Sequence, residues 1–136
     1  MRPIIILLFC LAIAGCKTNQ TVNGEREGLW VEKSKIGQLK YKTRGRYENG
    51  FEVKTWRFRE NGKLVRKEIY RDSLCLVTHY RNGKKSLEGH TKLKVSDQDI
   101  HWFYTGDWRE YDTQGNLVAI RTYENGELVN EVETIN

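Results

Sequence analysis

The chain has 136 residues, of which 38% are hydrophobic and 30% are charged, and its formal net charge is +5. This length suits one ordinary domain better than two domains with separate cores. A single proline against twelve glycines excludes a proline-rich linker and a collagen-like repeat.

The first fifteen residues have the three parts of a secretory signal. Arg2 supplies a short positive region, residues 4–13 form an apolar run, and small residues precede Cys16. The apolar run is too short to cross a hydrocarbon core of about 30 Å as a helix. We therefore expect residues 1–15 to be a signal peptide that is removed.

The four residues Ile13-Ala14-Gly15-Cys16 resemble the lipobox of bacterial lipoproteins. The resemblance implies that Cys16 is lipidated and becomes the first residue of the mature protein, held on a membrane by several acyl chains. The alternative is an ordinary secreted protein in which Cys16 is incidental. We expect a lipid-anchored protein of the bacterial cell envelope, and the non-acidic Lys17 favours the outer membrane.

Residues 17–27 are polar and contain one apolar residue, Val22. Such a composition is typical of a solvated segment. Residues 16–27 are therefore predicted to form a lipidated tether ahead of a folded domain at 28–133.

Cysteine usage leaves one thiol in the predicted domain. Cys10 leaves with the signal and Cys16 carries lipid, so Cys75 has no partner for an intramolecular disulfide. Because Cys75 lies between two leucines, we expect it to be a small buried hydrophobe rather than a nucleophile.

From residue 28 onward, turn signals recur along the chain. An aromatic residue followed within a few positions by Asn-Gly appears repeatedly, and both central residues of a type I′ hairpin turn need positive φ. The predicted turns fall at residues 37, 50, 62, 73, 83, 115 and 126. This spacing leaves strands of about five or six residues on each side of a turn. The predicted fold is all-β, an antiparallel meander of β-hairpins.

A longer period overlies the turns. Trp30, Trp56 and Trp108 each begin a unit that contains a glycine six or seven residues later. The motif Gly-x-Trp-x-x-Tyr-x-x-x-Gly-x-Leu, present at residues 106–117, resembles the MORN (membrane occupation and recognition nexus) repeat. It is most similar to the variant found in bacterial lipoproteins and in antitoxin-like proteins. The resemblance implies units that stack on their neighbours to form one repeat sheet.

The sequence departs from the repeat motif in two places. Lys54 stands where the first glycine of a unit is expected, and residues 86–104 match no unit. We expect residues 86–104 to form an irregular insertion. Insertions between repeats commonly build a binding face, which makes Trp102 and Tyr104 candidate binding residues. The alternative is that this segment caps the sheet.

The charges are segregated along the chain. Residues 33–94 hold 18 Lys and Arg against 6 Asp and Glu, a net +12, whereas residues 95–136 hold 2 against 9, a net −7. Alternation along the strands places aromatic residues on one face and cations on the other. The candidate binding cations are Lys40, Lys42, Arg44, Arg46, Arg57 and Arg59.

A basic strand face near a membrane favours an anionic partner. Lipid headgroups and anionic envelope polymers are the nearest such partners, and a nucleic acid partner conflicts with export. One alternative is a solvated face kept charged to prevent edge pairing. Another is head-to-tail association of the oppositely charged ends.

Catalytic signals are weak. His79, His90 and His101 are spaced eleven residues apart and, with Asp97 and Asp99, define a hypothetical metal site of a metal-dependent hydrolase at 86–104. No HExxH, GxSxG or CxxC motif accompanies them. We expect a binding or scaffold module with no chemistry, cofactor or metal of its own. The alternative is an antitoxin-like module that covers a protein partner.

Overall fold

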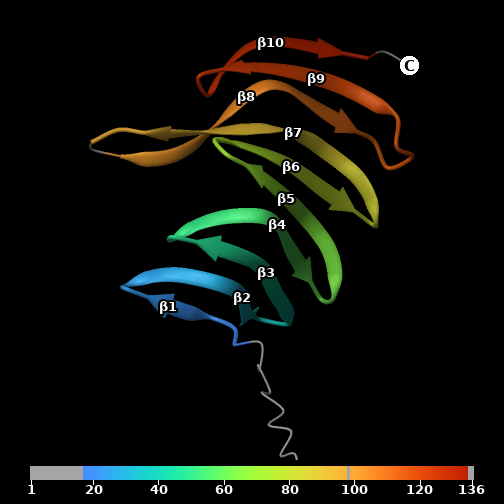
Figure 1. Cartoon of the computed structure of the whole chain (residues 1–136). Coiled ribbons are helices and arrows are strands. Elements are labelled where there is room, and N and C mark those ends of the chain that lie inside the picture. Colours follow the sequence, from blue (N-terminus) through green and yellow to red (C-terminus); the bar gives the residue numbers. More distant parts are fainter. Residues whose placement is uncertain (1–16, 98, 135–136) are drawn as a thin grey trace, which may run out of the picture.

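The computed structural model describes residues 17–97 and 99–134, which form one antiparallel sheet of ten strands in chain order (Figure 1). The strands are β1 (Gln20–Val22), β2 (Glu25–Ile36), β3 (Leu39–Glu48), β4 (Phe51–Glu60), β5 (Lys63–Arg71), β6 (Leu74–Arg81), β7 (Lys84–Val95), β8 (Ile100–Tyr111), β9 (Leu117–Glu124) and β10 (Glu127–Glu133). The sheet is open, with β1 and β10 at its two edges. The predicted all-β meander of hairpins is confirmed. The predicted signal at 1–15 and the predicted lipidation site Cys16 lie outside the described residues.

The Asn-Gly pairs form the hairpin turns, as predicted. Both residues of each pair have positive φ, for example 50° at Asn49 and 78° at Gly50. This is the combination that a two-residue type I′ turn requires. Gly37, with φ of 59°, begins the turn between β2 and β3, where a single positive φ at the first central position fits a type II′ turn.

The folded sheet begins earlier than the predicted boundary at residue 28. Strand β1 and the start of β2 lie within residues 17–27, the segment expected to be a tether, and the two strands pair in register. Their turn is Asn23-Gly24, the same hairpin signal as elsewhere, with φ values of 51° and 83°. The polar composition of this segment reflects an exposed edge strand rather than a solvated tether.

One form of bulge occurs twice in the sheet. Residues 54–56 of β4 lie opposite Gly45 alone, and residues 106–108 of β8 lie opposite Gly89 alone. The first residue of each bulge has positive φ, 61° at Lys54 and 65° at Gly106. Lys54 therefore adopts the conformation that glycine adopts in the other unit. The repeat motif changes here in residue type and not in backbone shape.

A tryptophan covers the glycine at each bulge. A Cβ atom on Gly45 would lie 1.9 Å from Cδ2 of Trp56, and one on Gly89 would lie 2.2 Å from Cδ2 of Trp108. The indole N–H of Trp56 donates a hydrogen bond to the carbonyl of Arg46 (3.2 Å). That of Trp108 donates to the carbonyl of His90 (3.0 Å). Any side chain at the glycine would therefore displace the ring.

The sheet curls toward its aromatic face. The rings of Tyr70 on β5 and Trp102 on β8 have centroids 5.3 Å apart, although three strand spacings in a flat sheet amount to about 14 Å. The curl encloses a core of Cys75, Val77 and Trp108. Cys75 is 1% exposed, so the prediction of a buried thiol is confirmed.

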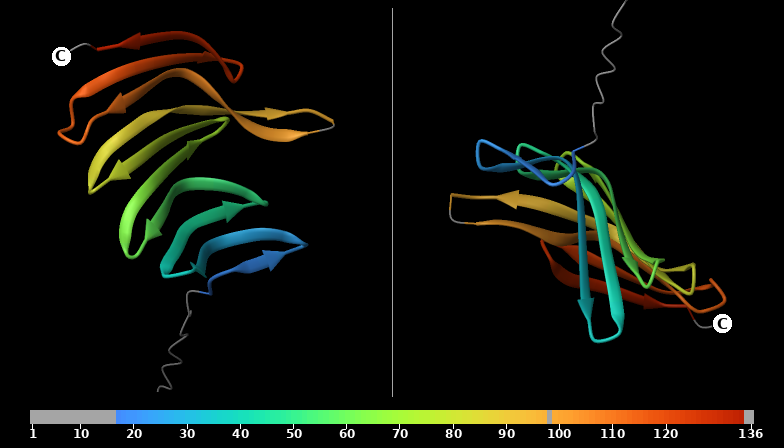
Figure 2. Two further views of the ribbon diagram at one scale, coloured as in Figure 1. Left: turned by 180° about the vertical axis from the view of Figure 1, so that it is seen from behind. Right: turned by 90° about the horizontal axis from the view of Figure 1, so that it is seen from below.

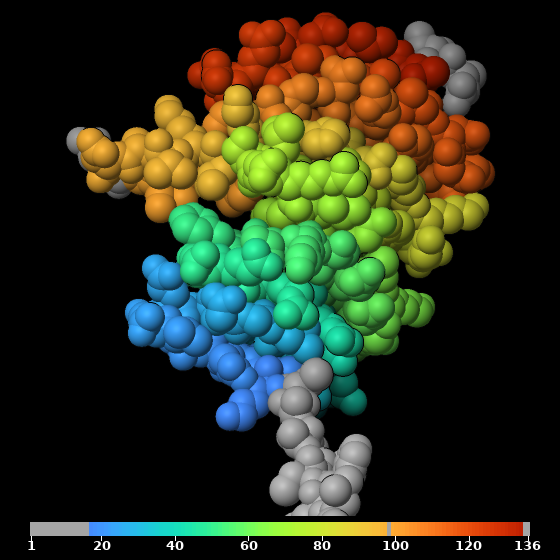
Figure 3. All heavy atoms as spheres, viewed as in Figure 1, coloured from blue at the N-terminus to red at the C-terminus, as the bar shows by residue number. Residues whose placement is uncertain are grey.

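The expectation of an irregular insertion at 86–104 is wrong. Strands β7 and β8 are regular, with 12 residues each, and pair in register along most of their length. Their hairpin extends beyond the neighbouring strands in both views of Figure 2 and projects from the body of the molecule in Figure 3. Residues 92–95 alternate polar and apolar side chains, which is a strand pattern. The segment lacks only the repeat motif.

Candidate functional site

The two faces predicted for β3 are present in the structure. Tyr47 is buried and Tyr41 is half-buried, whereas the cations that alternate with them are exposed. The registers of β2 to β5 bring these cations and those of the neighbouring strands to one side of the sheet. We call this surface the basic face; it consists of Lys33, Lys35, Lys40, Lys42, Arg44, Arg46, Arg57, Arg59 and Lys67.

Six of these nine cations were candidates from the sequence, and the structure brings all six together. The other three, Lys33, Lys35 and Lys67, were missed because their face depends on the strand register. Lys33 lies opposite Lys42, and Lys67 lies opposite Arg57. A tight turn at Gly37 fixes the register of β2 on β3, and this was the signal in the sequence that could have identified Lys33 and Lys35.

Eight of the nine cations of the basic face lie directly opposite another cation. The five opposed pairs are Lys33 with Lys42, Lys35 with Lys40, Lys42 with Arg59, Arg44 with Arg57, and Arg57 with Lys67. Side chains at opposed positions on antiparallel strands have Cβ atoms about 4.5–5.5 Å apart, and like charges there destabilise the sheet.

No ion pair relieves this repulsion within residues 17–97 and 99–134. The ion pairs found there involve other cations, among them Arg26, Arg66, Lys85 and Arg121. Glu48, at the end of β3, is paired with Lys54 at 3.6 Å rather than with a member of the basic face. The basic face therefore presents uncompensated positive charge to its surroundings.

Two hollows cross the basic face. The first, of about 440 Å³, is lined by Leu29, Gly45, Thr55 and four arginines, Arg44, Arg46, Arg57 and Arg59. The second, of about 480 Å³, is lined mainly by Lys33, Lys35, Lys40, Lys42 and Arg59. Guanidinium groups bind carboxylate and phosphate oxygens in a bidentate manner, so the first hollow is well suited to such anions.

The two aromatic candidates lie on the opposite face of the sheet. Trp102 packs edge-to-face on Tyr70, and Tyr104 stacks on Trp108 with ring centroids 4.0 Å apart. Tyr104 also contacts Tyr123 edge-to-face at 5.2 Å. The structure therefore separates the predicted site residues into two groups, the basic face and an aromatic surface.

The three histidines are not brought to one place. His79 faces the aromatic side, where its pKa is lowered by burial and by the nearby Arg66, whereas His90 and His101 alternate onto the other face. His101 contacts Asp99 at 2.9 Å. Within the described ranges, no group of three or more His, Cys, Asp and Glu side chains has an arrangement that could hold a metal ion.

Comparison with known proteins leaves the family open. No protein-family model, no curated protein and no solved structure matches this chain. In the part of the chain that the structure describes, no helix is long and apolar enough to cross a membrane. The structure by itself establishes an all-β protein with a single ten-stranded antiparallel meander.

Proposed function

We propose that this chain is a lipid-anchored binding module of the bacterial cell envelope, in which the basic face docks on anionic lipid headgroups. One observation carries the proposal: five pairs of directly opposed cations share one face without a carboxylate partner in the described part of the chain. An anionic surface offsets the repulsion that such pairs create. The lipobox resemblance of residues 13–16 and the MORN-like motif support the same assignment.

The order of the strands supports this orientation. Gln20, the first residue of β1, follows the proposed anchor Cys16 by four residues, a span of at most about 14 Å when extended. Strands β2 to β5 come next in the sheet, and the acidic strands β8 to β10 form its far end. The lipid would thus hold the basic end of the sheet close to the headgroups.

Electrostatic docking of the basic face would add binding free energy to that of the lipid anchor. A cation near an anionic leaflet contributes about 1 kcal/mol, an effect that decays within a Debye length of about 8–10 Å. A polybasic surface next to an acylated residue provides the second signal that makes membrane attachment stable. No catalytic step is part of this proposal.

The test uses the chain from Lys17 onward, which contains every described strand and lacks the lipid. We expect it to co-sediment with vesicles that contain phosphatidylglycerol, and to be released by salt. Reversing four charges with Lys40→Glu, Lys42→Glu, Arg44→Glu and Arg46→Glu should weaken binding by about 100-fold or more.

The matched control reverses the same number of charges elsewhere. Lys54, Lys63, Arg81 and Lys84 are exposed cations whose strand positions alternate onto the aromatic side, away from the basic face. Changing these four residues to Glu gives the same net charge and should weaken binding by less than about tenfold, because only the general attraction is reduced. Equal losses in the two quadruple variants would contradict a specific basic face.

A further inference from the structure

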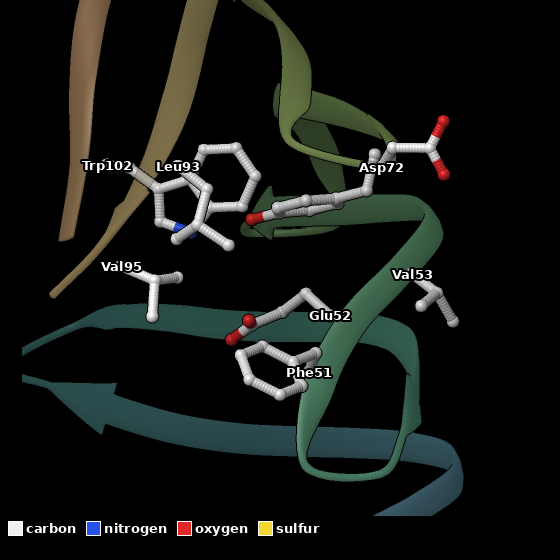
Figure 4. A pocket seen from close by; sticks show the side chains of 8 residues that line it. Phe51, Glu52, Val53, Asp72, Leu93, Val95 and Trp102 are labelled. Carbon is white, nitrogen blue, oxygen red and sulfur yellow. The ribbon is translucent and has the colours of Figure 1, made fainter. Parts of the chain in front are cut away.

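A further hollow lies where the start of β4 meets the aromatic face, and none of its lining residues belongs to the basic face. It has a volume of about 330 Å³ and lies between the start of β4 and the β7–β8 hairpin. Six apolar or aromatic residues and two carboxylates line it: Phe51, Val53, Tyr70, Leu93, Val95, Trp102, Glu52 and Asp72. Figure 4 shows this hollow from close by.

Three aromatic side chains form much of the wall. Tyr70 and Trp102 meet edge-to-face with ring centroids 5.3 Å apart and ring planes at 76°. The Tyr70 hydroxyl donates to the Glu68 carboxylate (2.7 Å), which holds the phenol ring in place. Phe51 is 48% exposed, and in Figure 4 its ring lies on the opposite side of the hollow from Trp102.

A carboxylate points into this aromatic wall. In Figure 4 the Glu52 carboxylate lies between the Phe51 and Trp102 rings, whereas Asp72 points away from the centre. Glu52 accepts a hydrogen bond from the Tyr47 hydroxyl (3.1 Å), which leaves oxygen lone pairs free to accept from a ligand. Glu52 forms no ion pair within residues 17–97 and 99–134.

The charge of the hollow is opposite to that of its surroundings. No Lys or Arg lines it, although residues 33–94 carry a net +12. The nearby cation Arg26 attracts Glu52 from outside the hollow: its guanidinium donates to the Tyr47 hydroxyl (2.8 Å) and lies over the Trp30 ring at 4.8 Å. A hollow with aromatic walls and a carboxylate, but no cation of its own, is complementary to a cationic ligand with an apolar surface.

We propose that this hollow binds a small alkylated ammonium ion. The rings of Phe51, Tyr70 and Trp102 line the hollow with aromatic and apolar surface, which favours a weakly hydrated ammonium group. The Glu52 carboxylate supplies the counter-charge. A volume of about 330 Å³ is at the small end of ligand pockets and suits a compact ligand. The site is independent of the basic face and of its proposed partner.

The test is calorimetric titration of the whole chain, purified in a neutral detergent, with choline. We expect saturable binding with a dissociation constant of about 1 mM or tighter. The uncharged isostere 3,3-dimethylbutan-1-ol, which has the same shape, should bind at least about tenfold more weakly because it lacks the positive charge. Equal binding of the two compounds, or no saturable binding of choline, would overturn the proposal.

Two variants locate the site without removing a buried group. Glu52→Gln keeps the size of the side chain and an acceptor for the Tyr47 hydroxyl, and should weaken choline binding by about tenfold. Phe51→Ala removes a half-exposed ring and should weaken it several-fold. The matched controls are Glu60→Gln on the same strand and Phe103→Ala on the other face of β8, and both should bind choline as the unaltered chain does.

A spectroscopic readout separates local binding from a general effect. Choline should shift the indole N–H signal of Trp102 in a proton–nitrogen NMR spectrum and leave that of Trp30 in place, because Trp30 lines no part of the hollow. Binding that leaves the Trp102 signal unchanged, or that is as tight in Glu52→Gln as in the unaltered chain, would place the ligand elsewhere and refute this site.

Discussion

Arg44 on β3 and Arg57 on β4 lie directly opposite each other, and neither forms an ion pair within the described ranges. Arg57 also lies opposite Lys67 on β5, so Arg57 has a cation opposite it on each of the two neighbouring strands. Such an arrangement costs stability in the isolated protein. We interpret this cost as the consequence of a surface shaped for binding anions.

The first prediction follows from this arrangement. Arg57→Glu should raise the free energy of unfolding by about 0.5–1 kcal/mol, because it replaces two repulsive cross-strand pairs with attractive ones. Urea denaturation at low salt measures this difference. Arg57→Gln should give a smaller gain, and added NaCl should narrow the difference between the variants. A less stable Arg57→Glu protein would show that the opposed cations do not repel each other appreciably.

The second prediction concerns the contact between Gly45 and Trp56. Gly45→Ala should lower the free energy of unfolding by about 2–3 kcal/mol, since the new Cβ would overlap the indole ring and force the chain apart. In an ordinary strand, the same change is neutral or stabilising. The sign of the change in urea denaturation is therefore decisive. Gly89→Ala, beneath Trp108, should behave in the same way.

The third prediction concerns the left-handed backbone at Lys54. A non-glycine residue in this region of φ and ψ is strained by about 1–2 kcal/mol. Glycine removes this strain, but its greater conformational freedom in the unfolded chain offsets part of the gain in stability. Lys54→Gly should therefore stabilise the domain by about 0.5–1 kcal/mol. Loss of the exposed ion pair with Glu48 should matter little. The control Lys42→Gly, at an extended position, should instead destabilise it.

The fourth prediction concerns the buried thiol. Burial, together with the nearby Glu68, raises the pKa of Cys75 to about 12, whereas an unfolded thiol ionises near pH 9.0. Above pH 9 the unfolded chain loses this proton and the folded chain retains it, so stability falls as pH rises toward 12. The slope for this group is at most about 1.4 kcal/mol per pH unit.

Comparison with Cys75→Ala isolates the contribution of the thiol. That variant should be less stable at pH 7 because it leaves a small cavity, but its stability should decline less between pH 9 and 12. Burial and the nearby Glu68 also raise the pKa of Tyr70, which adds to the alkaline decline in both proteins; because Cys75 is a smaller cause of that shift, most of the Tyr70 contribution cancels in the comparison. Parallel pH profiles of the two proteins would contradict a strongly raised pKa at Cys75.

The meander was predictable from the sequence because its turns depend on local chemistry. Asn49-Gly50 and the equivalent pairs favour a hairpin wherever they occur between alternating segments. Asn23-Gly24 carries the same signal, but the polar residues around it indicated a tether, and β1 was missed. The alternation of residues 92–95 likewise indicated a strand, but the absence of a repeat motif led to the prediction of an irregular insertion.

The basic face was partly predictable, and the hollow lined by Phe51 and Trp102 was not. Alternation along one strand places Arg44 and Arg46 on one side, whereas the face of Lys67 depends on the registers of three successive strands. The hollow joins Phe51 and Trp102, which come from strands four apart in the sheet. They line the same hollow only because the sheet curls, and no local pattern in the sequence encodes that curl.

The proposed docking requires that the basic face of the sheet lies against the membrane. The most direct measurement is NMR of the lipidated chain in nanodiscs that contain phosphatidylglycerol and a spin-labelled lipid. We predict that amide signals of residues 40–46 and 57–59 broaden strongly, whereas those of residues 107–122 do not. In nanodiscs of zwitterionic lipid, this difference should largely disappear. Strongest broadening on β8 to β10, or the same pattern with both lipids, would contradict docking through the basic face.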